Sequence, residues 1–192
     1  NAGAAEKTRC SFDECRRKRE GKRAVLMFDP TAFDNLKVVL EGAIYDADLG
    51  GVITVIGRKD LVDLAAMSRC YQNTFQLKEG NKTVSAEFQL SMSLSQLSGE
   101  LLKTNAVPEC EVILTFQARS SSAETTVKSI VEELWGVYSI THQISYKVPF
   151  EHYHHTFKVH FNRLIGEEQV DDLITMTDHA IDTLEKIKEG AK

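Results

Sequence analysis

The sequence predicts an α+β fold in which helices pack on one face of an antiparallel sheet. Apolar and polar residues alternate strictly over Val84–Leu94, a period of two that is typical of a strand with one buried and one wet face. The same alternation recurs over Val137–Val148 and Tyr153–Phe161, and an apolar stripe at helical spacing runs through Glu167–Lys188. Because parallel sheets are usually covered on both faces, one wet face favours antiparallel pairing.

Length and composition are those of an ordinary globular protein. A chain of 192 residues is long enough to bury a large core without disulfides or metal. The net charge of −5 argues against a dedicated nucleic-acid binder. No apolar run reaches the ~20 residues of a membrane span, and no signal peptide is recognised. We therefore expect a cytoplasmic protein with no membrane partner.

We divide the chain into three parts. Residues 1–22 form a polar, basic arm or short helix, residues 23–104 an N-terminal α+β section, and residues 105–192 a C-terminal section. The polar stretch Lys103–Glu109, with Pro108, separates the last two, which can also form one domain. The apolar run Arg23–Asp29 predicts a strand that Pro30 ends.

The segment Phe33–Asp48 fits either a helix or a strand. A turn signal at residues 48–51 and the β-branched run Val52–Ile56 follow it directly, which favours a hairpin. Lys59–Tyr71 has apolar residues on one helical face and is predicted as a helix. Asn73–Leu77 then forms a hairpin with Val84–Leu94, and Ser95–Lys103 a short helix.

The C-terminal section has the order β-α-β-β-α. Glu111–Gln117 is the first strand, and Ser121–Glu124 has the S-x-x-E form of a capping box that begins a helix. Gly136 ends this helix, and two alternating strands and the long final helix follow. The order resembles most of a ferredoxin-like unit without its last strand, a likeness of topology that many functions share.

Four of the six histidines lie in the segment Phe150–Asn162. His152 and His154 are two residues apart, so on a strand their side chains lie on one face, separated by about 6.8 Å along it. Two such imidazoles can share a metal ion, with Glu151 or a residue on a neighbouring strand as a third ligand. The alternative interpretation is a solvated, histidine-rich hairpin end.

The register of this hairpin follows from its apolar faces. They coincide only if paired residue numbers add to an odd value, and the turn predicts a sum near 301. His142 then faces Val159 beneath the helices as a core histidine, and His160 faces Thr141.

The opposite face of the predicted sheet is polar and is a candidate ligand or partner surface. Its candidate residues are Thr141, Gln143, Lys158, His160 and Asn162. The serines of Val84–Leu94 form a similar stripe. If that strand lies at an edge of the sheet, copies of the chain can join by sheet extension.

A basic cluster near the N-terminus offers candidate phosphate contacts at Arg16, Arg17 and Arg19. It supports association with nucleic acid through the arm as a weaker alternative, because no aromatic residues are interleaved with it. The four cysteines lack the spacing of a metal site, and we expect free thiols.

The sequence contains no nucleotide-binding or nucleophile motif, and it identifies no cofactor and no small-molecule ligand. We therefore expect a binding or assembly module that forms a homo-oligomer rather than an enzyme. The rival is a metal-dependent hydrolase that uses the histidine-rich hairpin.

Overall fold

The structure, a computed structural model, describes residues 31–80, 82–102 and 107–190. Along the chain the elements are α2 (Ala32–Leu49), β1 (Ile53–Asp63), β2 (Ser68–Leu77), β3 (Val84–Met92), α3 (Leu94–Leu101), β4 (Cys110–Ser120), α4 (Thr126–Trp135), β5 (Ser139–Tyr146), β6 (Tyr153–Ile165) and α5 (Val170–Gly190). A 3₁₀ turn, Glu167–Gln169, precedes α5. The predicted arm, its candidate arginines and the strand at Arg23–Asp29 lie outside the described residues.

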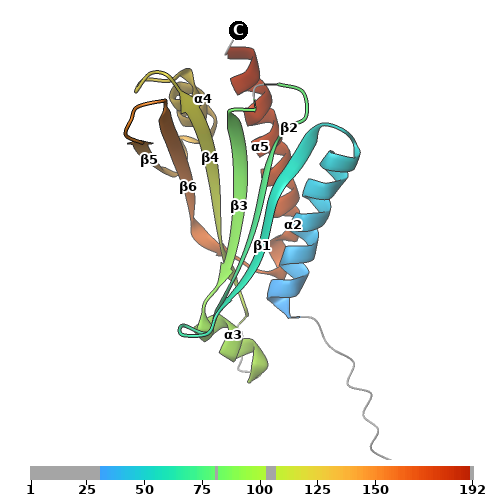
Figure 1. Cartoon of the computed structure of the whole chain (residues 1–192). Helices are drawn as coiled ribbons and strands as arrows, with labels where there is room; N and C mark the ends of the chain where they lie inside the picture. Colours follow the sequence, from blue (N-terminus) through green and yellow to red (C-terminus); the bar gives the residue numbers. More distant parts are fainter. Residues whose placement is uncertain (1–30, 81, 103–106, 191–192) are drawn as a thin grey trace, which may run out of the picture.

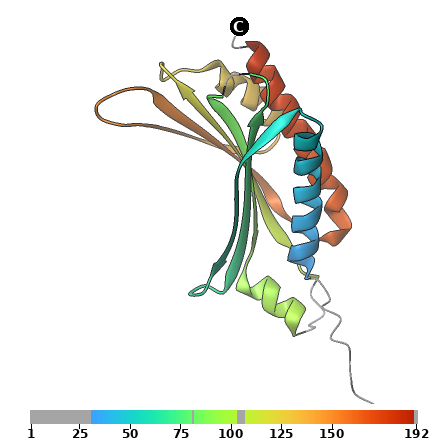
Figure 2. The same ribbon diagram turned by 45° about the vertical axis from the view of Figure 1, so that its right-hand side comes forward.

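All six strands form one antiparallel sheet with the order β1-β2-β3-β4-β6-β5. The helices α2 and α5 lie along one face of this sheet, which confirms the predicted α+β layering (Figure 1). The β5–β6 hairpin projects away from these two helices (Figure 2). Because β3 pairs with β4 from Val84 opposite Ala118 to Ser91 opposite Glu111, the sheet is continuous across the segment where we placed a boundary.

The C-terminal section has the predicted order, β4-α4-β5-β6-α5. Within the sheet β6 lies between β4 and β5, which is the arrangement of a split β-α-β unit. The core of this section is centred on Trp135, whose ring contacts Phe116 and Phe161. Its indole nitrogen donates a hydrogen bond of 3.0 Å to the Thr183 hydroxyl, so α4 and α5 are tied together through one buried polar contact.

The alternation that predicted β3 corresponds to its burial. Ala86, Phe88, Leu90 and Met92 are buried under the helices, and Phe88 stacks on Phe75 of β2 at 6.3 Å between ring centroids. The intervening polar residues lie on the opposite face. Since β3 has β2 on one side and β4 on the other, it is a central strand, and the sheet extension that we made conditional on its being an edge does not apply to it.

The hairpin predicted for Phe33–Asp48 is wrong, because the segment is the helix α2. Thr31 caps its first turn by accepting a hydrogen bond from the backbone N–H of Asp34. The helix stripe includes Phe33, Leu36 and Leu40, all of which are fully buried against the sheet. Both periodicities are present in these residues, and the sheet they cover decides between them.

The helix predicted for Lys59–Tyr71 is also wrong. These residues form the end of β1, a turn over residues 64–67 and the start of β2. The two strands pair from Ile53 opposite Leu77 to Asp63 opposite Ser68, and Met67 takes the positive φ of 51° that the tight turn needs. Long-range pairing therefore outweighs a short apolar stripe at helical spacing.

Two local expectations in the C-terminal section need correction. The capping box at Ser121–Glu124 is wrong, because the helix begins later and Thr125 is its cap, accepting a hydrogen bond from the N–H of Val127. The predicted end at Gly136 is confirmed. In the β5–β6 register the paired numbers add to 299 rather than 301, an odd value as predicted, so His142 faces Phe157 rather than Val159. His160 likewise faces Ser139 rather than Thr141, because the centre of the turn lies one residue earlier in the chain than expected.

Among the described helices, none is long and apolar enough to cross a membrane.

Candidate functional site at the β5 edge and the open sheet face

The strand β5 is one edge of the sheet, and it lacks the features that usually protect an edge strand from pairing. It pairs with β6 alone, without a register shift, from Ser139 opposite His160 to Tyr146 opposite Tyr153. Its eight residues, S-I-T-H-Q-I-S-Y, contain no Lys, Arg, Asp, Glu or Pro. Natural edge strands are normally protected by such residues or by a bulge, since their unpaired backbone groups can bind another strand. The backbone of β5 is therefore available for pairing.

The sequence along this edge reads nearly the same in both directions. From Tyr138 to Tyr146 it is Y-S-I-T-H-Q-I-S-Y, with His142 at the centre. The mirrored positions hold Tyr and Tyr, Ser and Ser, and Ile and Ile, and only Thr141 and Gln143 differ. An antiparallel pair of two such strands about a two-fold axis at His142 places matching residues opposite each other and keeps each on its own face of the sheet.

Apolar side chains at the end of the hairpin lie on the helix side of the sheet, beyond the helices themselves. Ile144 is 43% exposed, Tyr146 60% and Phe150 51%. The rings of Tyr146, Phe150 and Tyr153 contact one another, with Phe150 4.8 Å from Tyr153 between centroids. This cluster is an exposed apolar surface that continues along β5, and such surfaces commonly mark interaction sites.

A chain of hydrogen bonds runs inward from the centre of β5. His155 is buried, and its Nε2 lies 3.1 Å from the carbonyl oxygen of Ser122, which can only accept, so this nitrogen carries the proton. The other ring nitrogen, Nδ1, then accepts from Nε2 of His142 at 3.2 Å. Burial, followed by electrostatic interactions with His155 and Lys128, lowers the pKa of His142. His142 lies half-buried at the centre of the edge strand, where its ring stacks on Phe157. It is therefore not enclosed in the core as predicted, because β5 has a neighbouring strand on one side only.

The predicted polar face exists on the open side of the sheet. Thr141 of β5 faces Lys158 of β6, while Gln143 faces Thr156. His160 and Asn162 lie at the other end of β6, in a depression of about 300 Å³ that also includes Glu111. Asn162 has a positive φ of 54° and lies in an irregularity of the β4–β6 pairing, where three residues of β6 stand opposite one residue of β4. The five predicted residues are therefore spread along the face rather than gathered at one point.

The predicted metal ligands are neighbours. The imidazoles of His152 and His154 lie 4.5 Å apart between centroids, and the Nδ1 atom of His152 is 4.0 Å from Oε2 of Glu151. Among residues 31–80, 82–102 and 107–190, no three His, Cys, Asp or Glu side chains are grouped so that they could hold a metal ion.

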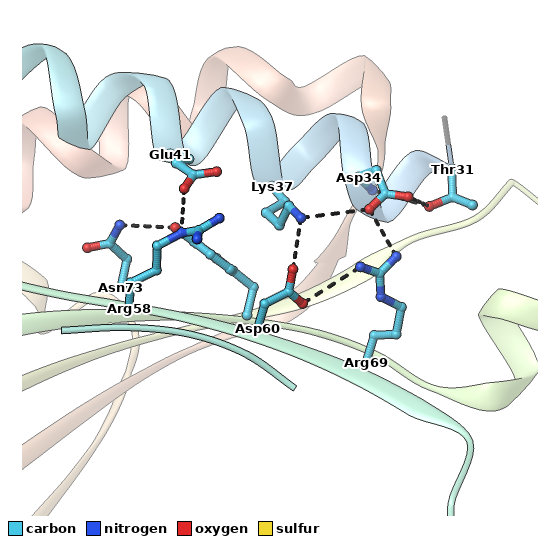
Figure 3. A network of polar contacts seen from close by, with 9 residues as sticks. Thr31, Asp34, Lys37, Glu41, Arg58, Asp60, Arg69 and Asn73 are labelled. Atoms are coloured by element: carbon cyan, nitrogen blue, oxygen red, sulfur yellow. Dashed lines mark hydrogen bonds and ion pairs between the residues drawn. The ribbon is translucent and has the colours of Figure 1, made fainter. Parts of the chain in front are cut away.

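A second polar cluster joins α2 to the sheet (Figure 3). Arg69 lies 2.9 Å from Asp34 and is positioned over the ring of Phe33, and Asp60 accepts a hydrogen bond of 2.9 Å from Lys37. Although burial opposes the shift, hydrogen bonds from Thr31 and Arg69 lower the pKa of Asp34. Every charged side chain in this cluster has a partner of opposite sign. We call the cluster the α2 anchor, because such pairing is typical of a structural contact.

The described cysteines, Cys70 and Cys110, are free. Burial raises the pKa of Cys70 and raises that of Cys110 to about 12. Both are therefore protonated thiols, which are poor nucleophiles.

Comparison with protein-family models, with curated proteins and with solved structures finds no match to this chain. The β5 edge was missed by sequence reasoning, although the mirrored run Tyr138–Tyr146 is readable in the sequence. That run could have been noticed, but its place at an edge depends on strand order.

Proposed function

We propose that this chain is an assembly module in which two copies join through β5. The strands pair antiparallel about a two-fold axis at His142, and the two six-stranded sheets continue into one another. The observation that carries the proposal is the unprotected, mirror-like β5 edge, where the backbone is free and matched side chains would face each other.

The proposed pairing gives each side chain a suitable neighbour. On the helix side Ile140 faces Ile144 of the second copy, and Tyr138 faces Tyr146, so the exposed apolar surface becomes covered. On the open side Ser139 faces Ser145, and Thr141 faces Gln143, all of which can exchange hydrogen bonds. No charge is buried anywhere along this seam, since β5 carries none.

The register of this pairing can be tested by exchanging charges. In the variant Thr141→Lys/Gln143→Lys, each new ammonium group faces another in the second copy, and like charges directly opposite disfavour association. In Thr141→Glu/Gln143→Lys, every new carboxylate faces a new ammonium group, so pairing is restored. Sedimentation velocity of the full chain at tens of micromolar is expected to show a dimer, a monomer for the first variant and a dimer for the second.

The matched control is Thr54→Lys on the opposite edge, in β1, which is expected to leave the dimer intact. Circular dichroism checks that each variant is folded. A wild-type chain that sediments as a monomer overturns the proposal. A dimer that both double variants leave unchanged shows that the copies join elsewhere.

A cytoplasmic location is part of this proposal. It is supported by the free Cys70 and Cys110, because oxidising compartments favour disulfides.

A further inference from the structure

A small polar depression lies on the open face of the sheet, at the end of β4 nearest α4. Its volume is about 140 Å³. Ser85 of β3, Gln117 of β4 and Thr156 of β6 form one row across its floor, because each is paired with the next in the sheet register. These groups can all donate hydrogen bonds, and their positions are set by central strands rather than by loops.

Cationic side chains surround this floor. Arg119 and Lys82 line the depression, and His154 faces Arg119 across the β4–β6 pair. No Asp or Glu is among the residues that line it. Within the described part of the chain, neither Arg119 nor Lys82 is in an ion pair. By contrast, the arginines of the α2 anchor, Arg58 and Arg69, both have carboxylate partners.

The local electrostatic field has the sign that favours an anion. Arg119 and Lys82 both carry a positive charge, and no carboxylate among the lining residues offsets it. These two positive charges would repel a metal cation held beside them at His154. A bound anion would instead be attracted. Of the predicted metal ligands, His154 therefore lines a depression whose charges favour an anion.

We propose that this depression binds a phosphate group, either as inorganic phosphate or as the end of a small phosphate monoester. The planar guanidinium of Arg119 matches two phosphate oxygens, and Lys82 supplies a second positive charge. The hydroxyls of Ser85 and Thr156 and the amide of Gln117 complete the set of donors. The site does not depend on the dimer, because joining the sheets at β5 extends the open face without covering it.

The test is a titration of the uniformly ¹⁵N-labelled full chain at constant ionic strength, followed by backbone amide shifts. Inorganic phosphate is expected to saturate, with the largest shifts confined to Gln117, Arg119 and Thr156. Arg119→Ala is expected to weaken binding about tenfold, as for loss of a charge-assisted bidentate contact. Arg119→Lys keeps the positive charge but loses the planar guanidinium that can contact two oxygens at once, and it is expected to recover only part of the affinity. Lys186→Ala, an exposed change on α5, is the matched control and leaves binding unchanged.

Phenyl phosphate distinguishes the two sources, since a monoester site binds it at least as tightly as inorganic phosphate. Acetate, with one negative charge and two oxygens, is expected to bind far more weakly. Acetate binding as tightly as phosphate, or shifts scattered over exposed lysines and unaffected by Arg119→Ala, would overturn the proposal. So would the lack of saturation at about 50 mM phosphate, well above the millimolar range expected of one small anion.

Discussion

The two edges of the sheet differ in almost every property that governs strand pairing. β1 carries Arg58, Lys59, Asp60 and Asp63 and has a bulge between Val55 and Gly57. β5 carries no charge and pairs with β6 in perfect register. Both edges expose apolar side chains, among them Leu61 in β1 and Ile144 in β5, so apolar exposure does not separate them. The two edges differ instead in charge and in the regularity of their pairing. The charged residues and the bulge of β1 are features that prevent edge-to-edge association.

The difference extends to what lies beside each edge. β1 is held to α2 by ion pairs, including that of Arg58 with Glu41 at 2.6 Å, so its charged side chains serve the fold of a single copy (Figure 3). The hairpin end of β5 projects beyond α2 and α5 (Figure 2). Two of the aromatic side chains there, Tyr146 and Phe150, are exposed. The charged side chains of β1 thus have partners within one copy, whereas the outer backbone of β5 pairs with a second copy only in our proposal.

We expect the largest effect when a single positive charge is placed on each edge in turn and dimer dissociation is compared. Ile144→Lys puts an ammonium group opposite Ile140 of the second copy and removes an apolar contact. We expect the dimer dissociation constant to rise about 100-fold, or ~2.8 kcal/mol. Ile56→Lys, an exposed position in β1, is the control and leaves the constant unchanged. Sedimentation equilibrium measures both, and equal effects at the two edges would refute the assignment of β5.

The anchor of β1 can be tested by its contribution to stability. Arg69→Met removes the ion pair to Asp34 and the contact with the ring of Phe33. The partly buried Asp34 carboxylate then keeps only the more distant Lys37, at 3.9 Å, as an ionic partner. We expect the free energy of unfolding to fall by about 1–3 kcal/mol in urea denaturation. Arg163→Met, which breaks the exposed pair with Asp172, is expected to cost at most about 0.5 kcal/mol. If the two losses are equal, the α2 contacts are not an anchor.

The β5 seam is expected to depend on pH through His142. Its pKa in the folded chain lies below the ordinary value of 6.5, and the groups that face it are His155, Lys128 and Glu132. At a pH above its pKa in the folded chain, His142 is neutral and the dimer is favoured. As the pH falls below that pKa, protonation weakens the dimer, because the imidazolium groups of the two copies would face each other.

Between about pH 7.5 and 5.5 we expect the dimer dissociation constant to rise about tenfold. In His142→Gln, which retains a donor toward His155 but cannot titrate, the constant should be nearly independent of pH. A slope that survives in this variant would assign the effect to other groups.

The smallest effect is expected when β1 loses part of its protection. Lys59→Thr removes one charge from this edge while the bulge at Val55 and the remaining charges persist. We expect less than about a twofold change in any association constant, since several devices protect the edge together. If sedimentation velocity instead shows assemblies larger than a dimer, Lys59 alone prevents the β1 edge from pairing with another copy.

Patterns confined to one element were predicted well from the sequence. The alternation in Val84–Leu94 and Tyr153–Phe161 identified strands and their buried faces, because period-two burial is a property of each strand alone. The apolar stripe of the last helix, α5, and the end of α4 at Gly136 were likewise predicted from local sequence. The predictions failed for two segments, Phe33–Asp48 and Lys59–Tyr71. Their apolar residues fit both helical and strand periodicity, and the outcome depended on which surface each segment covers.

The candidate sites divide in the same way. The proximity of His152 and His154 follows from their spacing on one strand, and the mirrored run around His142 is written in the sequence. By itself, then, the sequence determined the faces of the strands and the residues that β5 presents. Only the tertiary structure decided that β3 is central and β5 an edge, and that Arg119 meets His154, because strand order and register are set by contacts between residues far apart in the chain.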